Sequence, residues 1–267
     1  MGILNVTPDS FGEPRPRLDA AAAIDAALEM EADGADIIDV GGESTRPGAD
    51  VVSAAEEATR VLPVIRGLAG CLKIPVSIDT YKTEVARAAV AEGAAIVNDI
   101  SGLRYEPALG SVVAAAGAAL VLTHTRGRSK GMYDNANYQD VAADVIVELG
   151  ESIARAIAAG VARERLIVDP GIGFAKRPAH SYGVLARLPE LVALDRPVLV
   201  GPSRKSFLRE ALQDRPAPER DWGTAAAVTA AVLGGAHIVR VHAVAEMVQV
   251  VRVAEEIRKG SHLKSEA

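Results

Sequence analysis

The chain has 267 residues, of which 49% are apolar and 3% aromatic, and no run reaches the roughly 18 uninterrupted apolar residues of a membrane-spanning helix. A formal net charge of −6, without a block of Lys or Arg, argues against nucleic acid or an anionic membrane as a partner. Because Ala, Val and Ile take the place of aromatic residues, the composition favours a parallel sheet covered by Ala-rich helices.

Short runs rich in Val and Ile alternate with longer segments of helical spacing along the whole chain. The runs predict strands at residues 2–6, 35–40, 75–79, 95–98, 119–123, 166–169, 197–201 and 237–241. The segments between them predict helices at 19–32, 53–68, 82–92, 138–159, 181–194, 223–233 and 245–259. Pro107 and the neighbouring glycines leave room for only a short helix between 102 and 117.

This alternation predicts a single (β/α)8 TIM barrel over residues 1–259, followed by a frayed polar tail at 260–267. An open doubly wound sheet is the alternative, but the phosphate-binding pattern GxGxxG is missing after the first strand. In such barrels the active site lies at the C-terminal ends of the strands.

Polar residues follow the predicted strands at this end of the barrel. They are Asn5 with Asp9, Asp39 with residues 43–46, Asp79, Asn98 with Asp99, His124, Asp169, the run 203–206, and Arg240 with His242. For some members a structural role is an open alternative. Asp39 and Asp79 could be helix caps, Asp99 could pair with a basic neighbour, and His124 could be a core imidazole.

The charges in this set predict two kinds of contact. Arg240 and His242 alternate on the last strand, so they point the same way and could bind an anion together. Asp79 and Asp169 are suited to a flat ring that carries adjacent N–H groups, because a carboxylate accepts two parallel hydrogen bonds. In the run 203–206, Arg204 is either structural or part of a ligand pocket.

Two further features concern the compartment. Cys71 is the only cysteine, which excludes a disulfide within one chain, and its apolar neighbours predict a passive core thiol. Since no basic leader with an apolar core is visible, the sequence predicts a cytoplasmic protein.

Taken together, the motifs resemble those of the dihydropteroate synthase family of pterin-binding enzymes, from the first residue to about residue 254. They are MGILNVTPDSF (1–11), DIIDVGGESTRPG (36–48), VSIDTYK (76–82), IVNDISG (96–102), IVDPGIGF (167–174), SRKS (203–206) and RVH (240–242). The resemblance implies a transferase of folate biosynthesis that joins 6-hydroxymethyl-7,8-dihydropterin diphosphate to 4-aminobenzoate and releases diphosphate. It implies an SN1-like mechanism, in which diphosphate departs before the amine attacks.

The resemblance also implies roles for single residues. Asp79, Asn98, Asp169 and Lys205 match the residues that hold the pterin, and Asp79, Asp169 and Lys205 are the expected catalytic groups. Arg240 and His242 match the diphosphate site, Ser206 the aminobenzoate carboxylate, Thr45 and Arg46 the cover of the aminobenzoate, and Asn5 a Mg²⁺ ligand. The family is commonly dimeric, so a homodimer is expected.

Several positions depart from the family pattern, among them Thr125, Ser129 and Ala243, and two further departures bear on the site. The first loop reads GEPRPRLD where a Gly-rich segment is common, and Ala175 stands where Gly is frequent. Both could alter the aminobenzoate side and with it sensitivity to sulfonamides. Three other functions are alternatives: a methyltetrahydrofolate-binding methyltransferase, a lyase with Lys205 as a Schiff-base amine, and a pterin-binding protein without catalysis.

Overall fold

The structure is a computed structural model of the chain, and it describes residues 1–7, 20–44, 48, 50–128 and 131–260. The predicted contacts of Asp9, Thr45 and Arg46, and the tail from residue 261, lie outside the described residues. Within them the strands are β1 (Gly2–Asn5), β2 (Ile38–Gly41), β3 (Val76–Asp79), β4 (Ile96–Asp99), β5 (Ala119–Thr123), β6 (Leu166–Asp169), β7 (Leu199–Val200) and β8 (Ile238–Val239).

Each strand is followed by helical structure. The α-helices are α1 (Ala20–Ala32), α2 (Ala54–Ala69), α3 (Thr83–Ala91), α4 (Leu109–Ala116), α5 (Val141–Ala158), α6 (Pro178–Ala186), α7 (Asp221–Leu233) and α8 (Val244–Gly260). Short 3₁₀ helices are η1 (Arg163–Arg165), η2 (Leu188–Leu194), η3 (Ser206–Leu208) and η4 (Ala217–Glu219). Every predicted strand and helix therefore has a counterpart, although one predicted helix is divided into α6 and η2.

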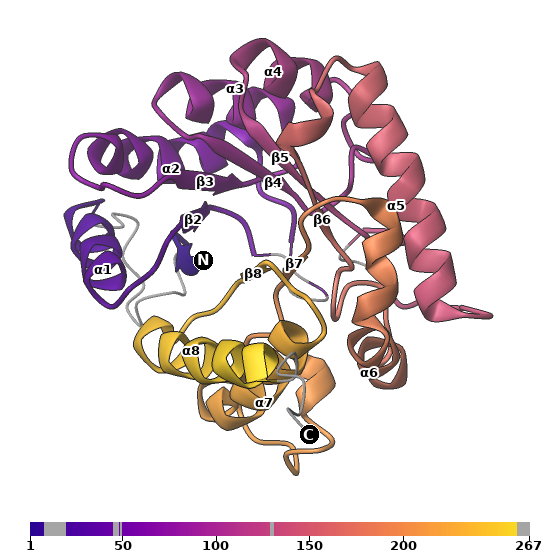
Figure 1. The fold of residues 1–267 in the computed structure, drawn as a ribbon. Coiled ribbons are helices and arrows are strands. Elements are labelled where there is room, and N and C mark those ends of the chain that lie inside the picture. The colour runs from indigo at the N-terminus through magenta and orange to yellow at the C-terminus, as the bar shows by residue number, and fades with distance from the viewer. Residues whose placement is uncertain (8–19, 45–47, 49, 129–130, 261–267) are drawn as a thin grey trace.

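The strands form a ring. Strands β1 to β6 make one parallel sheet in sequence order, and β7 pairs in parallel with β8. Single bridges link the two sheets at both joints, Val168 with Val198 and Gly2 with Val241. Since the last strand lies beside the first, the (β/α)8 barrel is confirmed and the open sheet is excluded. Figure 1 shows the helices arranged around these strands.

Side chains alternate between the two faces of each strand and so form two apolar layers. On β5, Leu120 and Leu122 join the large core between strands and helices, whereas Val121 joins a smaller cluster with Ile96 and Leu199 inside the barrel. Asn98 follows Ile96 by two residues and faces the same way. The small apolar cluster thus fills the middle of the barrel. The inward positions nearest the carboxyl ends of the strands are occupied by polar residues.

One predicted helix is interrupted. The sequence predicts a continuous helix over 181–194, but α6 ends at Ala186 and the 3₁₀ helix η2 follows. Pro189 explains the break, because its ring blocks the α-helical hydrogen bond to the residue four positions earlier. The short helix expected between 102 and 117 is found as α4.

The prediction for Cys71 is wrong. The residue is exposed in the turn after α2, with its Sγ 3.0 Å from the carbonyl oxygen of Gly67. Its neighbour Leu68 is the residue that faces the core, fully buried. Within the described residues, no helix has both the length and the apolar character needed to cross a membrane.

Candidate active site

Polar residues from separate strands meet at the carboxyl end of the barrel. Parallel pairing sets Asp79 of β3 beside Asn98 of β4, and Asp169 of β6 beside Thr123 of β5. These residues share a cavity of about 40 Å³. Its lining consists of Asp79, Asn98, Ile100, Thr123, Asp169, Phe174, Gly201, Lys205 and Arg240. The fold thus brings together five of the predicted site residues, which are Asp79, Asn98, Asp169, Lys205 and Arg240.

Arg240 ties two of the carboxylates together. Its Nε donates to Asp39 Oδ2 at 2.5 Å, and its Nη2 donates to Asp79 Oδ2 at 2.8 Å. Asn98 Nδ2 donates to the same Asp39 oxygen at 2.9 Å. The helix-cap alternatives are therefore wrong, because Asp39 is fully buried in this network and the N-cap of α3 is Lys82.

The carboxyl group of Asp79 titrates near neutrality. Burial raises its pKa to about 7, against the opposing effect of Arg240, and the neighbouring Asp39 adds to the rise. Burial is the main cause because a carboxylate in an apolar wall loses its hydration. A pKa near neutrality in a ligand cavity is typical of a functional group.

Lys205 enters the cavity from the turn after β7. Its Nζ donates to the carbonyl oxygen of Ile172 at 2.7 Å and lies 4.4 Å from the ring centre of Phe174. Burial lowers its pKa to about 8, although Asp169 acts in the opposite direction. The lysine is thus an ammonium at neutral pH, with donors left for a ligand.

Asp169 is the second acid that lines the cavity. Its Oδ1 accepts a hydrogen bond from the backbone N–H of Gly171 at 2.7 Å. Burial raises its pKa above the ordinary value, while Lys205 lowers it. Asp169 and Asp79 therefore line one cavity with an ammonium and a guanidinium.

Arg240 and His242 have different neighbours in this structure. Arg240 contacts the carboxylates described above, whereas His242 Nδ1 lies 2.9 Å from Ser203 Oγ. The backbone N–H of His242 also donates to Ser203 Oγ, at 3.2 Å. The turn after β7 and the end of β8 are thereby joined at the mouth of the barrel.

Arg204 is structural. It has a left-handed backbone with φ of 57°, and its guanidinium makes a bidentate contact with Asp221, both distances being 2.7 Å. Thr224 Oγ1 accepts from its backbone N–H at 3.0 Å. This turn leaves Lys205 directed into the cavity and Ser206 exposed at the start of η3.

Asn5 and Gly41 form the side of the site nearest β1. A Cβ placed on Gly41 would lie 3.7 Å from Asp79 Oδ2 and 3.8 Å from Asn5 Oδ1, so a larger residue would fill the space between these oxygens. Among the described residues, no group of three or more His, Cys, Asp or Glu could hold a metal ion. One amide oxygen beside a carboxylate fits a Mg²⁺ that keeps most of its water and phosphate ligands.

Two candidates from the sequence have structural roles. Asp99 faces away from the cavity and accepts hydrogen bonds from the backbone N–H groups of Ser101 and Leu103, at 2.8 and 2.6 Å. Its expected basic partner is therefore replaced by a local turn. Of the two alternatives for His124, a ligand contact or a core imidazole, the structure shows the core imidazole. Its side chain is fully buried and contacts Glu148 and Lys176.

Sequence reasoning missed Phe174, Thr123 and Lys176. Phe174 is one of only three phenylalanines, which is the one signal that could have singled it out. Thr123 could have been found from its inward position at the end of β5. Lys176 follows a glycine-rich loop, where a lysine is ordinarily exposed, and nothing in the pattern predicts its burial.

A (β/α)8 barrel with buried acids, one amide, one lysine and one arginine at its mouth defines a class of enzymes that bind a polar ring and an anion. Comparisons with known proteins identify the class more closely. The sequence profile described as "Pterin binding enzyme" matches residues 1–242.

Curated relatives carry a more specific name. The chain is 46% identical over 258 residues to the dihydropteroate synthase of Synechocystis, covering 96% of this chain and 89% of the relative. It is also 46% identical over 255 residues to that of Escherichia coli, covering 96% and 90%.

Solved structures agree. The Yersinia pestis dihydropteroate synthase, determined in a sulfonamide complex, superposes with a TM-score of 0.92 at 41% identity, covering 97% of this chain and 94% of that one. The Xanthomonas albilineans enzyme with 4-aminobenzoic acid gives 0.90 at 41% identity, covering 99% and 93%. The chain belongs to the pterin-binding enzymes and, among them, to the dihydropteroate synthase family.

Proposed function

We propose that this chain joins 6-hydroxymethyl-7,8-dihydropterin diphosphate to 4-aminobenzoate, giving 7,8-dihydropteroate and diphosphate. The observation that carries the proposal is the single cavity in which Asp79, Asn98, Asp169 and Lys205 meet. Relatives at 46% identity bear the name of this activity. A cytoplasmic location belongs to the same proposal.

The pterin ring is recognised by complementary hydrogen bonds. Asp79 and Asp169 accept from ring N–H and amino groups, and the ammonium of Lys205 donates to a ring oxygen or nitrogen. Asn98 adds an amide that can donate and accept, since its Oδ1 is buried without a partner among the described residues. A ligand that satisfies these groups replaces an unfavourable burial with paired contacts.

Ring binding requires a rearrangement of Arg240. The cavity of about 40 Å³ is far smaller than the roughly 300–1,000 Å³ of ordinary ligand pockets, so a bicyclic ring does not fit beside the present side chains. Arg240 occupies one oxygen of the Asp79 carboxylate, because its Nη2 donates to Oδ2 at 2.8 Å. The entering ring displaces the guanidinium from Asp79, and a bound diphosphate then gives the guanidinium a new anionic partner.

The reaction breaks the C–O bond between the pterin methylene and the diphosphate. The electron pair leaves with the diphosphate, whose charge Arg240 and His242 stabilise. Asp79 and Asp169 stabilise the positive charge that develops on the pterin. The amine of 4-aminobenzoate then forms the new C–N bond and loses one proton to solvent, while Ser206 contacts its carboxylate.

Magnesium is part of the proposal. Asn5 would hold the ion through its amide oxygen, with the remaining ligands from water and diphosphate oxygens. When bound, Mg²⁺ neutralises charge on the leaving diphosphate. The bare Cα of Gly41 leaves the space that such an ion needs beside Asn5.

An assay of diphosphate release tests the proposal. Release should require the pterin diphosphate and Mg²⁺, and 7,8-dihydropteroate should form only when 4-aminobenzoate is present. Slow release without the amine supports departure of diphosphate before attack. The proposed function is wrong if the folded chain with both substrates and Mg²⁺ forms no 7,8-dihydropteroate.

One substitution tests the buried acids. Asp169→Asn removes the charge that stabilises the pterin cation, so kcat/KM should fall by about two to three orders of magnitude while the fold survives. Asp195→Asn is the matched control, because this exposed aspartate at the end of η2 has a left-handed φ of 50° that Asn adopts readily. Near-normal kcat/KM in Asp169→Asn would remove this carboxylate from the mechanism.

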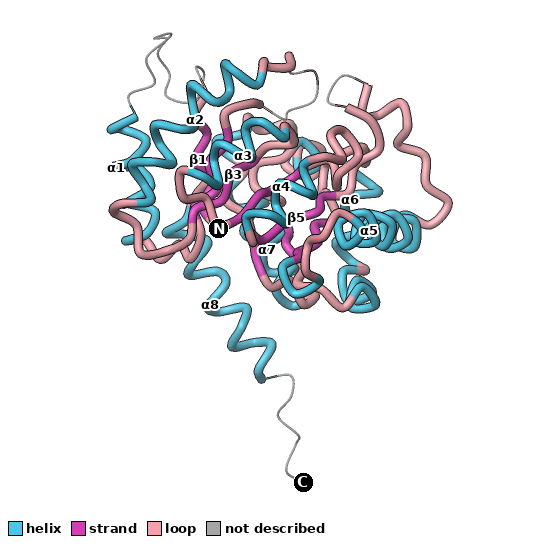
Figure 2. Tube along the Cα trace, turned by 90° about the horizontal axis from the view of Figure 1, so that it is seen from above, coloured by secondary structure: helices cyan, strands magenta, loops and turns pink. Residues whose placement is uncertain are grey.

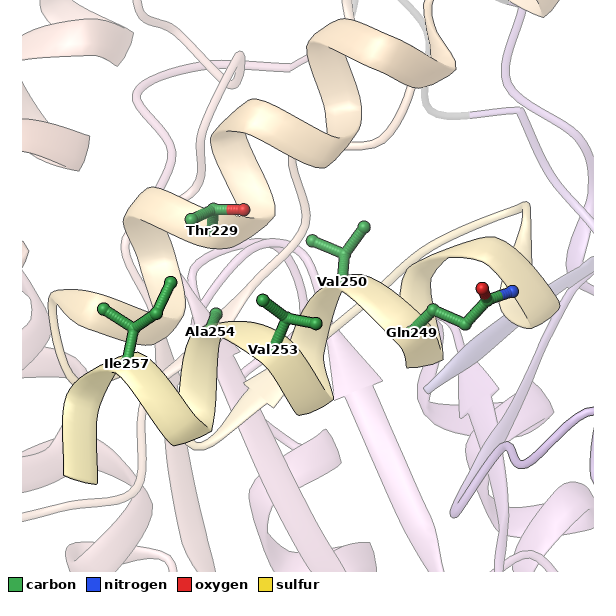
Figure 3. A pocket seen from close by; sticks show the side chains of 6 residues that line it. All are labelled: Thr229, Gln249, Val250, Val253, Ala254 and Ile257. Atoms are coloured by element: carbon green, nitrogen blue, oxygen red, sulfur yellow. The ribbon is translucent and has the colours of Figure 1, made fainter. Parts of the chain in front are cut away.

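We further infer that the chain forms a homodimer through α7 and α8. A hollow of about 310 Å³ lies between these helices, and Figure 3 shows the side chains that line it. Its lining consists of Thr229, Gln249, Val250, Val253, Ala254 and Ile257. Val253 and Ile257 are 62% and 55% exposed on α8, which extends beyond the barrel in Figure 2. An apolar helix pair of this kind is typical of a subunit interface.

A further inference from the structure

Lys176 is a fully buried lysine next to the site, in the loop that joins β6 to α6. Its side chain is among the largest that are completely enclosed, with an exposed fraction of 1%. Its Nζ lies 2.7 Å from His124 Nδ1 and donates to the carbonyl oxygens of Gly171 and Phe174, both at 3.2 Å. Three acceptors match the three protons of an ammonium group.

Keeping a cation at this position is unfavourable. Burial lowers the pKa of Lys176 well below its ordinary value, and the hydrogen-bond partners of its Nζ are an imidazole nitrogen and two carbonyl oxygens, with no carboxylate of the described residues among them. A buried ammonium without such a partner destabilises the fold compared with an apolar side chain of similar size. A role in the site would explain why a lysine stands here.

The acceptor on β5 is itself held in place. Burial and then the adjacent Lys176 lower the pKa of His124 to about 3, so the imidazole is neutral. A neutral ring that accepts at Nδ1 carries its proton on Nε2, and Nε2 lies 3.2 Å from Glu148 on α5. Glu148 in turn accepts from Arg104 at 3.0 Å. The contact to Lys176 is therefore anchored in the barrel wall, where β5, β6 and α5 lie side by side (Figure 1).

The loop that Lys176 holds has an unusual backbone. Gly171, Gly173 and Ala175 all have positive φ, at 68°, 81° and 47°. A Cβ on Gly171 would lie 2.0 Å from the carbonyl oxygen of His124, so the loop is pressed against the end of β5. Such a conformation persists only when the surroundings hold it.

Lys176 donates to the carbonyl oxygens of Gly171 and Phe174, and the segment between these two residues packs against the side chain of Lys205. The carbonyl oxygen of Ile172 accepts from Lys205 Nζ at 2.7 Å. A Cβ on Gly173 would lie 3.2 Å from the Lys205 side chain, and the ring of Phe174 lies under its ammonium. Lys176 fixes both ends of this short segment, at Gly171 and Phe174.

We propose that Lys176 is a positioning residue for the transfer reaction. It cross-links the β6–α6 loop to His124 and so holds Ile172 and Phe174 where they direct Lys205 toward the pterin. This inference rests on the proposed function, in which Lys205 binds the pterin ring. Lys176 itself does not line the cavity and acts through Lys205.

The test compares Lys176→Met with Lys205→Met and with the double variant. Lys176→Met should weaken binding of 6-hydroxymethyl-7,8-dihydropterin, measured by calorimetry, and lower kcat/KM for its diphosphate about ten- to hundredfold. The KM for 4-aminobenzoate should change less than about twofold, because its proposed carboxylate contact is Ser206, exposed at the start of η3, and not Lys205. When Lys176→Met is added to Lys205→Met, kcat/KM for the pterin diphosphate should fall by less than about threefold, because the effect of Lys176 passes through Lys205.

The control is a core truncation away from the loop. Leu68→Ala in α2 lowers stability without touching β5, β6 or Lys205, and its small effect on kcat/KM should be the same in both backgrounds. If Lys176→Met does not fold, Lys176→Gln keeps two donors and should show a smaller effect with the same dependence on Lys205.

The outcomes separate the two claims. No turnover by the unmodified chain contradicts the proposed function. Normal pterin affinity and kcat/KM in Lys176→Met, in an active chain, contradict this inference alone. Effects of Lys176→Met and Lys205→Met that multiply would mean that Lys176 acts on stability and not through Lys205.

Discussion

Asp79 and Lys205 are two ionisable side chains of one cavity whose pKa values lie on either side of the neutral range. The pKa of Asp79 is raised to about 7, and that of Lys205 is lowered to about 8. The proposed pterin contacts need the carboxylate ionised and the amine protonated. Both conditions hold together only in a narrow range of pH.

Pterin affinity should therefore have an optimum between about pH 7 and 8. For 6-hydroxymethyl-7,8-dihydropterin, which lacks the titrating diphosphate, Kd should rise about tenfold from the optimum to pH 6 and again to pH 9, as one proton is gained or lost. Calorimetric titrations across this range measure the effect. Lys205→Met should lose the alkaline rise and keep the acidic one, and a Kd that stays constant from pH 6 to 8 would contradict the assignment.

His124 should make stability depend on acid pH. Its pKa is about 3 in the folded chain and near 6.5 when unfolded, so only the unfolded chain gains a proton as pH falls below 6.5. The stability from this residue is complete above pH 6.5 and decreases toward pH 3, by about 1.4 kcal/mol per pH unit. The free energy of unfolding, measured with urea between pH 6.5 and 4.5, should decrease less steeply with falling pH in His124→Gln than in the unmodified chain. The difference between the two slopes should be about this amount. Parallel curves for the two proteins would exclude a neutral buried imidazole.

At the scale of residues, much of the site was predictable from strand alternation and some was not. Asp79 and Asp169 end strands whose preceding apolar residues, Ile78 and Val168, face the outer core, so their inward direction can be read from the sequence. The same rule separates Asn98 from the outward Asp99. This rule of strand alternation does not apply to Lys176, because its hydrogen-bond acceptors depend on the backbone conformation of an irregular loop.

At the scale of elements, the loop between β6 and α6 combines strain with function. Ala175 has a left-handed φ of 47° and is fully buried, where the family pattern commonly has Gly. Its carbonyl oxygen accepts a hydrogen bond from Tyr138 at 3.0 Å, which fixes the loop from the side of α5. The strain is confined to this loop. A substitution at Ala175 should therefore change the free energy of unfolding without changing the structure of the barrel.

Ala175→Gly should relieve the strain with a small net effect. A left-handed Ala costs about 1–2 kcal/mol compared with Gly, but Gly gives the unfolded chain more freedom, worth about 0.4–1 kcal/mol. The free energy of unfolding should therefore rise by about 0.5 kcal/mol, measured by urea unfolding. Ala175→Val, with a branched Cβ at the same φ, should lower it by more than about 2 kcal/mol. A loss of more than about 1 kcal/mol in Ala175→Gly would show that the alanine methyl is needed for packing.

Elements were predictable where they depend on local pattern. The eight strands follow from runs of Val and Ile, and the break after α6 could have been placed from Pro189. The residues at the ends of β7 and β8 were harder, because each of these strands has only two residues in the ladder and single bridges complete the ring. Their register depends on the whole barrel and not on local sequence.

At the scale of the whole molecule, the active site and the proposed dimer face lie on different parts of the barrel. The site lies at the carboxyl ends of the strands, whereas the exposed apolar face of α7 and α8 lies on the outer surface (Figures 1 and 3). A contact on this face leaves the cavity open to substrates.

The homodimer should depend on the apolar side of α8. In size exclusion with light scattering, the unmodified chain should have twice the monomer mass of 27.8 kDa. A stable interface of this kind buries about 800 Å² of each subunit. Val253→Glu puts a charge into this face and should give the monomer mass. Val147→Glu is the matched control, because Val147 on α5 is 63% exposed and Val253 is 62% exposed, yet α5 lies elsewhere on the barrel. If both variants elute like the unmodified chain, the α7 and α8 face is not the interface, and a monomeric unmodified chain would exclude the dimer itself.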